Sequence, residues 1–149
     1  MSGLWRHRPR WLAGALVLAV AGMAGAATFA PPADSSQQQV LHGEQVYVRC
    51  QACHALAQDR VGPHHCGLLG RRAGSVPGFA YSQAMKDSRI TWDEKTLDQF
   101  LSGPLKTMPG TSMTYDGVPD AKDRADLIAY LRHANESAQC RPSSSAAQR

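Results

Sequence analysis

The stretch "RCQACHAL", residues 49–56, is the part of the sequence on which the interpretation of the fold depends. Two residues separate Cys50 from Cys53, and His54 follows the second cysteine at once. Such a group can be a redox-active disulfide pair, half of a zinc site or the attachment point of a haem. Each possibility requires different surroundings, so the rest of the sequence has to distinguish them.

The surroundings of this group weigh against the first two possibilities. A thioredoxin-like pair follows a strand in a βαβ unit, and no strand-like alternation of apolar and polar residues occurs here. A zinc site needs a second pair of ligands, but Cys66 and Cys140 stand singly and His64 and His65 are adjacent residues of one loop. On a helical turn, by contrast, both thiols project to one side, where they can add to one haem with the following histidine beneath the iron. The order of the three residues therefore favours haem attachment.

Residues 1–26 have the features of a secretory signal peptide. Arg6, Arg8 and Arg10 precede an apolar run rich in alanine and glycine, and the small residues 24–26 provide a cleavage site. An uncleaved membrane anchor is the alternative, because the run is nearly long enough to span a bilayer. Its low content of leucine, isoleucine and phenylalanine favours cleavage, and export would permit disulfide bonds.

The rest of the 149-residue chain is long enough for one domain. Residues 27–39 are rich in proline, serine and glutamine without an apolar period, which predicts a flexible linker. We assign residues 40–138 to the folded domain and 139–149 to a polar C-terminal tail. The sequence has 16 basic and 12 acidic residues, and three of the basic residues lie in the signal. The mature chain is thus nearly neutral, and its charge gives no reason to expect nucleic acid or an anionic membrane as a partner.

The pattern of the domain predicts helices and no strands. The residues before His54 are compatible with a helix, a second helix begins at a capping box formed by Thr91 and Glu94, and a third begins at Asp120 and ends near Glu136. The stretch between the first two helices is rich in glycine and proline, so it is a long loop. Long loops of this kind are acceptable if a large apolar group other than protein fills the interior.

Six segments in the same order and with similar spacing resemble class I cytochrome c, the small soluble monohaem proteins of mitochondria and the bacterial periplasm. They are "CQACH", "VGPHHCGLLGRRAG", "PGFAYS", "ITWDEKTLDQFL", "MPGTSM" and "ADLIAYL". The resemblance covers about residues 43–136. It implies an all-α fold of the class I cytochrome c type, in which the N- and C-terminal helices cross and short central helices and long loops surround one covalent haem c.

The resemblance also implies how the haem and its iron are bound. Cys50 and Cys53 would attach the haem, and His54 would be the first axial ligand. The second axial ligand would be Met113, at the end of the segment "PGTSM", whereas Met108 would be a packing residue. The thioether favours the ferrous ion, so this ligand pair raises the reduction potential relative to two nitrogen ligands.

Other cofactor-binding residues follow from the same resemblance. The carbonyl of Pro63 would accept the imidazole N–H of the proximal histidine. Arg71, Tyr81, Trp92 and Thr111 would lie around the haem propionates, although ordinary packing is the alternative for the two aromatic residues. The resemblance further implies that the terminal helices cross at Gly43 and Tyr47 on one helix and Leu127 and Tyr130 on the other.

Two pairs of residues are not explained by haem binding. The resemblance brings the loop of Cys66 close to the end of the last helix, so we expect a disulfide with Cys140; two unpaired thiols or an intermolecular bridge are the alternatives. His64 and His65 replace a less polar run of the family. They are either competing iron ligands or hydrogen-bonded loop residues, and the sequence leaves their roles open.

These expectations describe a periplasmic carrier of single electrons and not an enzyme. With both axial positions filled the iron has no site for a small-molecule substrate, so no residue is expected to be catalytic and transfer must be outer-sphere. The partners would be membrane-bound or soluble redox proteins, and we expect a monomer. The alternatives are a haem peroxidase, a dedicated electron-accepting subunit of a periplasmic dehydrogenase, and a carrier tethered to the membrane by its N-terminal segment.

Overall fold

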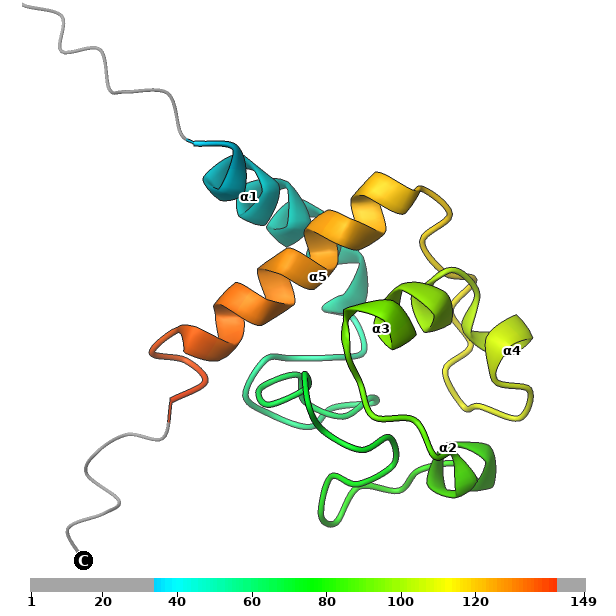
Figure 1. Cartoon of the computed structure of the whole chain (residues 1–149). Coiled ribbons are helices and arrows are strands. Elements are labelled where there is room, and N and C mark those ends of the chain that lie inside the picture. The colour runs from blue at the N-terminus through cyan, green and yellow to red at the C-terminus, as the bar shows by residue number, and fades with distance from the viewer. Residues whose placement is uncertain (1–33, 142–149) are drawn as a thin grey trace, which may run out of the picture. The chain divides into compact units, whose positions relative to one another are not determined.

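The computed structural model describes residues 34–141, and this part of the chain is helical (Figure 1). Its elements are α1 (Ser35–Tyr47), the 3₁₀ turn η1 (Val48–Cys50), α2 (Gln83–Asp87), α3 (Glu94–Leu101), α4 (Pro104–Thr107) and α5 (Ala121–Glu136). Within the described residues the pairing of extended backbone is limited to one isolated bridge between Arg72 and Thr91. The prediction of an all-α fold is confirmed.

Helix α1 begins earlier than its sequence pattern indicates. The side chain of Asp34 caps the helix by accepting hydrogen bonds from the backbone N–H groups of Ser36 and Gln37, at 2.8 and 2.9 Å. The predicted linker is therefore wrong for residues 35–39, which are helical. The first turn of α1 is exposed and buries no apolar side chain, so it carries no hydrophobic period by which the sequence could reveal it. The prediction of a signal peptide falls on residues outside the described part.

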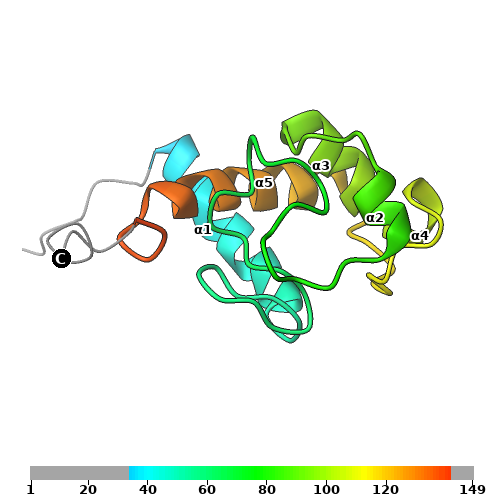
Figure 2. The same ribbon diagram turned by 90° about the horizontal axis from the view of Figure 1, so that it is seen from below.

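Helices α1 and α5 cross in close contact, as both ribbon views show (Figures 1 and 2). A Cβ atom built on Gly43 would lie 1.9 Å from the backbone oxygen of Asp126 and 2.8 Å from the Cβ of Tyr130. The rings of Tyr47 and Tyr130 pack beside this point with their centroids 5.1 Å apart, and Leu127 is 1% exposed. A side chain larger than hydrogen at position 43 is excluded, because the opposing atom is backbone.

Helix α3 has a different cap from the predicted one. The N-cap is Asp93, whose carboxylate accepts from the backbone N–H of Thr96 at 2.7 Å, and the hydroxyl of Thr96 accepts from the N–H of Asp93 at 2.8 Å. The predicted capping pair of Thr91 and Glu94 is wrong, because Thr91 is held in the bridge to Arg72. The prediction for α5 is confirmed, since its N-cap is Asp120 and it ends at Glu136.

The chain after α5 is attached to the long loop that follows η1. A disulfide joins Cys66 of that loop to Cys140, and the N–H of Gly67 donates to the side chain of Asn135 at 2.5 Å. In Figure 2 this loop, coloured teal to green, winds beside the helix pair before it reaches α2. Within residues 34–141, none of the helices is both long and apolar enough to cross a membrane.

The carboxylate of Asp126 is buried at the helix crossing. The Nδ1 of His42 lies 2.7 Å from its Oδ2, and the ammonium group of Lys122 also donates to it. Burial alone raises the pKa of Asp126, but the hydrogen bonds from Lys122, His42 and Gln39 outweigh burial and hold the pKa below its ordinary value. The charged form is therefore favoured by folding, and its contribution to stability is present at neutral pH.

Replacing Gly43 by Ala should destabilise the protein. Overpacking against rigid backbone costs about 1–3 kcal/mol, which exceeds the gain of about 0.5–1 kcal/mol that alanine gives over glycine in a helix. Guanidinium unfolding of the holoprotein measures the difference. The control is Gln45→Ala on the exposed face of the same helix, which should stay within about 0.5 kcal/mol of the wild type. A Gly43→Ala variant as stable as that control would contradict the crossing.

Replacing Asp126 by Asn should destabilise the protein in a pH-dependent way. Because the folded pKa is lowered, the stabilising effect of the carboxylate is complete above the ordinary pKa of about 3.9 and is lost as the pH falls below it. We expect Asp126→Asn to be about 1–2 kcal/mol less stable than the wild type at pH 7. The effect is no larger because the side chains of His42 and Lys122 are exposed to solvent, which screens their charges. Unfolding at a series of pH values should show this difference shrinking below about pH 4. A difference that does not change with pH would refute the assignment.

Candidate functional site

A mostly apolar cavity of about 320 Å³ lies among the described helices and loops. Its walls come from the end of α1, η1, the loop after η1, α2, α3, the loop before α5 and α5 itself. All nine residues that the sequence suggested for cofactor binding line it: Cys50, Cys53, His54, Pro63, Arg71, Tyr81, Trp92, Thr111 and Met113. Residues as far apart in the sequence as Tyr47 and Leu131 thus meet around one space.

The two cysteines that line the cavity are part of a continuous helical turn. The N–H groups of Cys53 and His54 donate to the carbonyl of Cys50 at 3.1 and 2.9 Å, which directs the three side chains toward the cavity. Burial raises the pKa of the Cys50 thiol to about 11, although Arg49 acts in the opposite direction. A protonated thiol is not the low-pKa nucleophile of a redox-active pair. Nor do the described residues contain a cluster of three or more metal-ligating side chains, as a zinc site would need.

His54 is held so that one ring nitrogen is available to the cavity. Its Nδ1 lies 2.7 Å from the carbonyl oxygen of Pro63, and because a carbonyl only accepts, Nδ1 carries the proton and Nε2 has a free lone pair. Burial lowers the pKa of His54, and the hydrogen bond to Pro63 opposes this effect only in part. The imidazole is therefore neutral, which is the form that binds a metal.

Gly62 allows the chain to pass directly over the His54 ring. A Cβ atom at Gly62 would lie 2.2 Å from Cε1 and 2.5 and 2.6 Å from the two ring nitrogens. The distances to the two nitrogens barely exceed the distance to Cε1, whereas an atom in the ring plane beyond Cε1 would lie much farther from the nitrogens; the atom is therefore above the face of the ring. Any side chain here would displace the histidine, so the backbone forms a cradle that only glycine permits.

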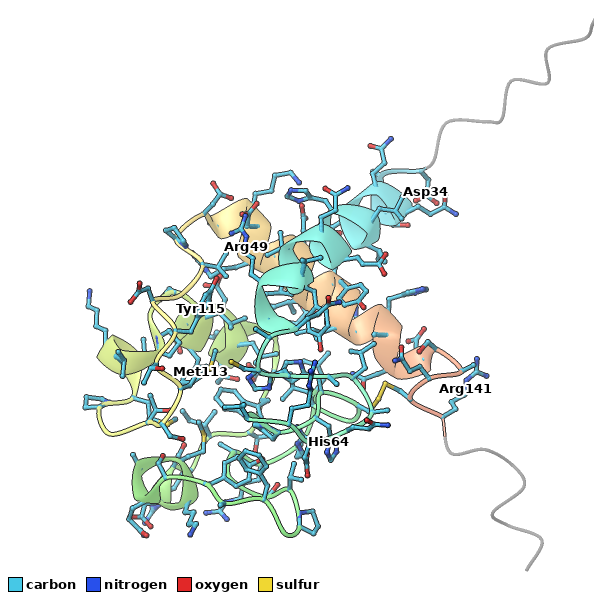
Figure 3. All side chains as sticks on the ribbon, turned by 180° about the vertical axis from the view of Figure 1, so that it is seen from behind. Asp34, Arg49, His64, Met113, Tyr115 and Arg141 are labelled. Atoms are coloured by element: carbon cyan, nitrogen blue, oxygen red, sulfur yellow. A yellow bond between two sulfur atoms is a disulfide. The ribbon has the colours of Figure 1, made fainter. Side chains whose placement is uncertain are left out.

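Met113 lies on the loop that leads into α5, where Figure 3 labels it. The turn before it is closed by the N–H of Thr111, which donates to the carbonyl of Met108 at 3.1 Å, and by Gly110, whose φ is +87°. The hydroxyl of Thr111 accepts from the N–H of Met113 at 3.3 Å. Met108 is 7% exposed and packs in the core without lining the cavity, whereas Met85 of α2 does line it.

The polar and aromatic residues expected near the propionates each have a partner in the protein. Arg71 donates to the carbonyls of Cys66 and His64, at 3.0 and 2.7 Å. The ring of Trp92 packs on Phe100 with centroids 5.1 Å apart, and the ring of Tyr81 packs edge-on against Phe79 at 4.7 Å. These residues therefore have structural contacts within the protein, and all of them also line the cavity.

The two adjacent histidines have different surroundings. His64, labelled in Figure 3, is bonded through both its N–H and its Nδ1 to the carboxylate of Asp59, at 2.8 and 2.6 Å. His65 lines the cavity, and its ring stacks on that of His54 with centroids 4.4 Å apart. Burial, together with the nearby His54, Arg71 and His64, lowers the pKa of His65 to about 3, so this ring is neutral. The sequence marked His65 as unusual but could not indicate the stack.

The donor set and the shape of the cavity fit a haem. Two cysteines on one turn are placed for covalent attachment, a neutral imidazole and a thioether are available as iron ligands, and the remaining lining is mostly apolar. Gly62 has no side chain, so the loop can pass over one face of the His54 ring without displacing it. No side-chain nitrogen or oxygen among the described residues is buried without a hydrogen-bond partner, so the cavity requires no other polar ligand.

Comparisons with known proteins agree with this reading of the cavity. The family model for cytochrome c matches residues 40–135. Cytochrome c2 of Rhodomicrobium vannielii is 49% identical over 92 residues, which are 60% of this chain and 74% of that protein. Cytochrome c2 of Blastochloris viridis is 42% identical over 113 residues, 74% of this chain and 87% of that protein. The structure of cytochrome cH from Methylobacterium extorquens superposes with a TM-score of 0.62 at 41% identity, over 63% of this chain and 97% of that one.

The match to the family model extends from the middle of α1 to the last turn of α5, so it includes the helix crossing and every wall of the cavity. The family carries one covalently bound haem c and consists of electron-transfer proteins. The haem peroxidase alternative is thereby excluded. The chain belongs to the cytochrome c family and is a small electron carrier with one covalent haem c, not an enzyme.

Proposed function

We propose that this protein is exported to the periplasm and carries single electrons between larger redox proteins, with its iron bound between His54 and Met113. The observation that supports this assignment is that Cys50, Cys53 and both proposed axial ligands line one apolar cavity, although Met113 lies 59 positions after His54 in the sequence. When bound, the haem supplies an iron that changes between the ferrous and ferric states by one electron.

The protein's own residues would determine how that iron behaves. The hydrogen bond from His54 to Pro63 fixes the tautomer and makes Nε2 a stronger donor, while the soft sulfur of Met113 favours the ferrous state. With both axial positions filled, no position remains for a substrate. The apolar lining keeps water from the metal, which also raises the potential because the extra charge of the ferric state is poorly solvated.

The proposed location rests on two features of the chain. The first 26 residues have the pattern of a secretory signal, and the described part contains the Cys66–Cys140 disulfide. Structural disulfides persist in oxidising compartments and are rare in the cytosol. Export and cleavage after about Ala26 explain both features together.

The described surface also supports a carrier that meets its partners briefly. Among the cavity-lining residues, those that are exposed include Cys53, Val61 and Ser112, so the cavity opens to solvent beside the haem attachment turn. The guanidinium of Arg49, which lies at the same opening, is paired with Asp123 at 3.3 Å. A redox protein can approach this opening without displacing a buried group.

The protein isolated from the periplasmic fraction should have the intact mass of residues 27–149 plus one haem. The haem should remain attached in denaturant, because the bonds to Cys50 and Cys53 are covalent. Replacing both Cys50 and Cys53 by Ala should abolish this mass increase. The matched control replaces Cys66 and Cys140 by Ala, which should retain the haem while losing stability. Haem loss in denaturant from the wild type would refute the attachment, and a mass that includes residues 1–26 would refute cleavage.

Replacing Met113 by Ala should remove the weak long-wavelength absorption band of the ferric protein that sulfur ligation produces. It should also lower the reduction potential, since water or a nitrogen ligand would replace the thioether. Met108→Leu and Met85→Leu are the controls, because they keep the volume of the two other buried methionines. Both controls should retain the band. If Met85→Leu loses the band and Met113→Ala retains it, the ligand has been assigned to the wrong segment.

A further inference from the structure

The imidazole ring of His65 packs against that of His54. The centroids of the His54 and His65 rings are 4.4 Å apart and the ring planes differ by 21°, which is a stacked arrangement. His65 is itself held by the hydroxyl of Tyr47, whose oxygen lies 3.1 Å from Nδ1 of His65. Tyr47 is 2% exposed and packs on Tyr130 of α5, so its hydroxyl is held in place by the helix crossing.

The hydrogen bond to Pro63 does not by itself define the orientation of the His54 ring. A hydrogen bond tolerates a range of angles, so it limits but does not fix the rotation of the ring about the Cβ–Cγ bond. Contacts with the faces of the ring are needed to stop this rotation. The structure provides two such contacts, the backbone of Gly62 above Cε1 and the stacked ring of His65.

We propose that His65 is a positioning residue for His54, which sets the plane of the proximal imidazole and lowers the reduction potential by stacking on it. The proposal rests on the assignment of His54 as an iron ligand. This role differs from that of the Pro63 carbonyl. The His65 ring contacts the face of the His54 imidazole, whereas the carbonyl accepts the proton on Nδ1.

The direction of the effect on the potential follows from electrostatics. A ligating imidazole shares part of the positive charge of the iron, and this share is larger in the ferric state. The π face of a neutral ring is negative and attracts positive charge, most strongly where water is excluded. The ring of His65 stacks on that of His54 and lines a cavity that is mostly apolar. Its stack therefore stabilises the ferric form more than the ferrous form, which an aliphatic side chain would not do.

The test compares His65→Leu with the same substitution one residue earlier, His64→Leu, in the holoprotein at fixed pH. His64 is a matched control because its side chain bonds to Asp59 and does not line the cavity. The first measurement is the order and spread of the haem methyl resonances in the proton NMR spectrum of the ferric protein, which depend on the orientation of the axial ligands. The second is the reduction potential. A loss of stability alone would not reorder the methyl resonances.

We expect His65→Leu to change the methyl pattern and to raise the potential, and His64→Leu to change neither. His65→Phe retains a ring and should give a pattern and a potential closer to the wild type than His65→Leu does. If the His65→Leu variant does not fold with its haem attached, Tyr47→Phe provides the test instead. This substitution removes only the hydroxyl that holds His65, and it should still alter the methyl pattern.

Wild-type patterns and potentials in both His65→Leu and Tyr47→Phe would overturn the proposal, as would an equal change in His64→Leu. A failure of the underlying function is distinguishable from these outcomes. If His54 is not a ligand, the wild-type ferric protein itself will lack the low-spin spectrum of an iron bound by nitrogen and sulfur.

Discussion

The close approach of α1 and α5 at Gly43 is the constraint on which the rest of the structure depends. Hydrogen in place of a side chain lets the backbone of α1 meet the carbonyl of Asp126, and this contact fixes the position of α1 against α5. The turn that carries Cys50 and Cys53 follows α1 directly, so the crossing also determines where this turn lies. Tyr47, at the last residue of α1, packs on α5 and also reaches His65. A contact between two helices thereby becomes a restraint on the proposed iron ligand.

The loop after the attachment turn is long but well anchored. The Pro63 carbonyl holds His54, Asp59 holds His64, and Arg71 binds two carbonyls of the same loop. The disulfide from Cys66 attaches the loop to the chain after α5. These bonds offset the entropic cost of ordering a long loop that has little regular secondary structure. A rigid proximal side is useful to an electron carrier, since little reorganisation then accompanies a change of one charge.

The cavity combines apolar walls with two imidazoles that remain neutral. Burial keeps the rings of His54 and His65 uncharged, as the directions of their pKa shifts indicate. Fixed charges beside the iron would strongly favour one oxidation state, whereas neutral dipoles and ring faces adjust the balance by small amounts. In the proposed assignment, the sulfur ligand would raise the reduction potential and the stacking of His65 on His54 would lower it. The potential would then be tuned from both sides of the metal.

Local signals in the sequence determined the parts of the structure that depend on neighbouring residues. The order Cys50-x-x-Cys53-His54 indicated the proposed attachment turn, the Asp120 cap specified the start of α5, and the lack of alternation specified an all-α fold. The start of α1 escaped detection because its first turn is solvated and needs only the Asp34 cap, and the cap of α3 was misplaced because Thr91 is engaged in a long-range bridge. The stacking of His65 on His54 could not be read from their spacing of eleven residues, since it depends on how the loop folds back against Tyr47. The sequence by itself determined the chemistry that is available, and only the tertiary structure decided which groups face one another, because those contacts join segments whose separation no local pattern encodes.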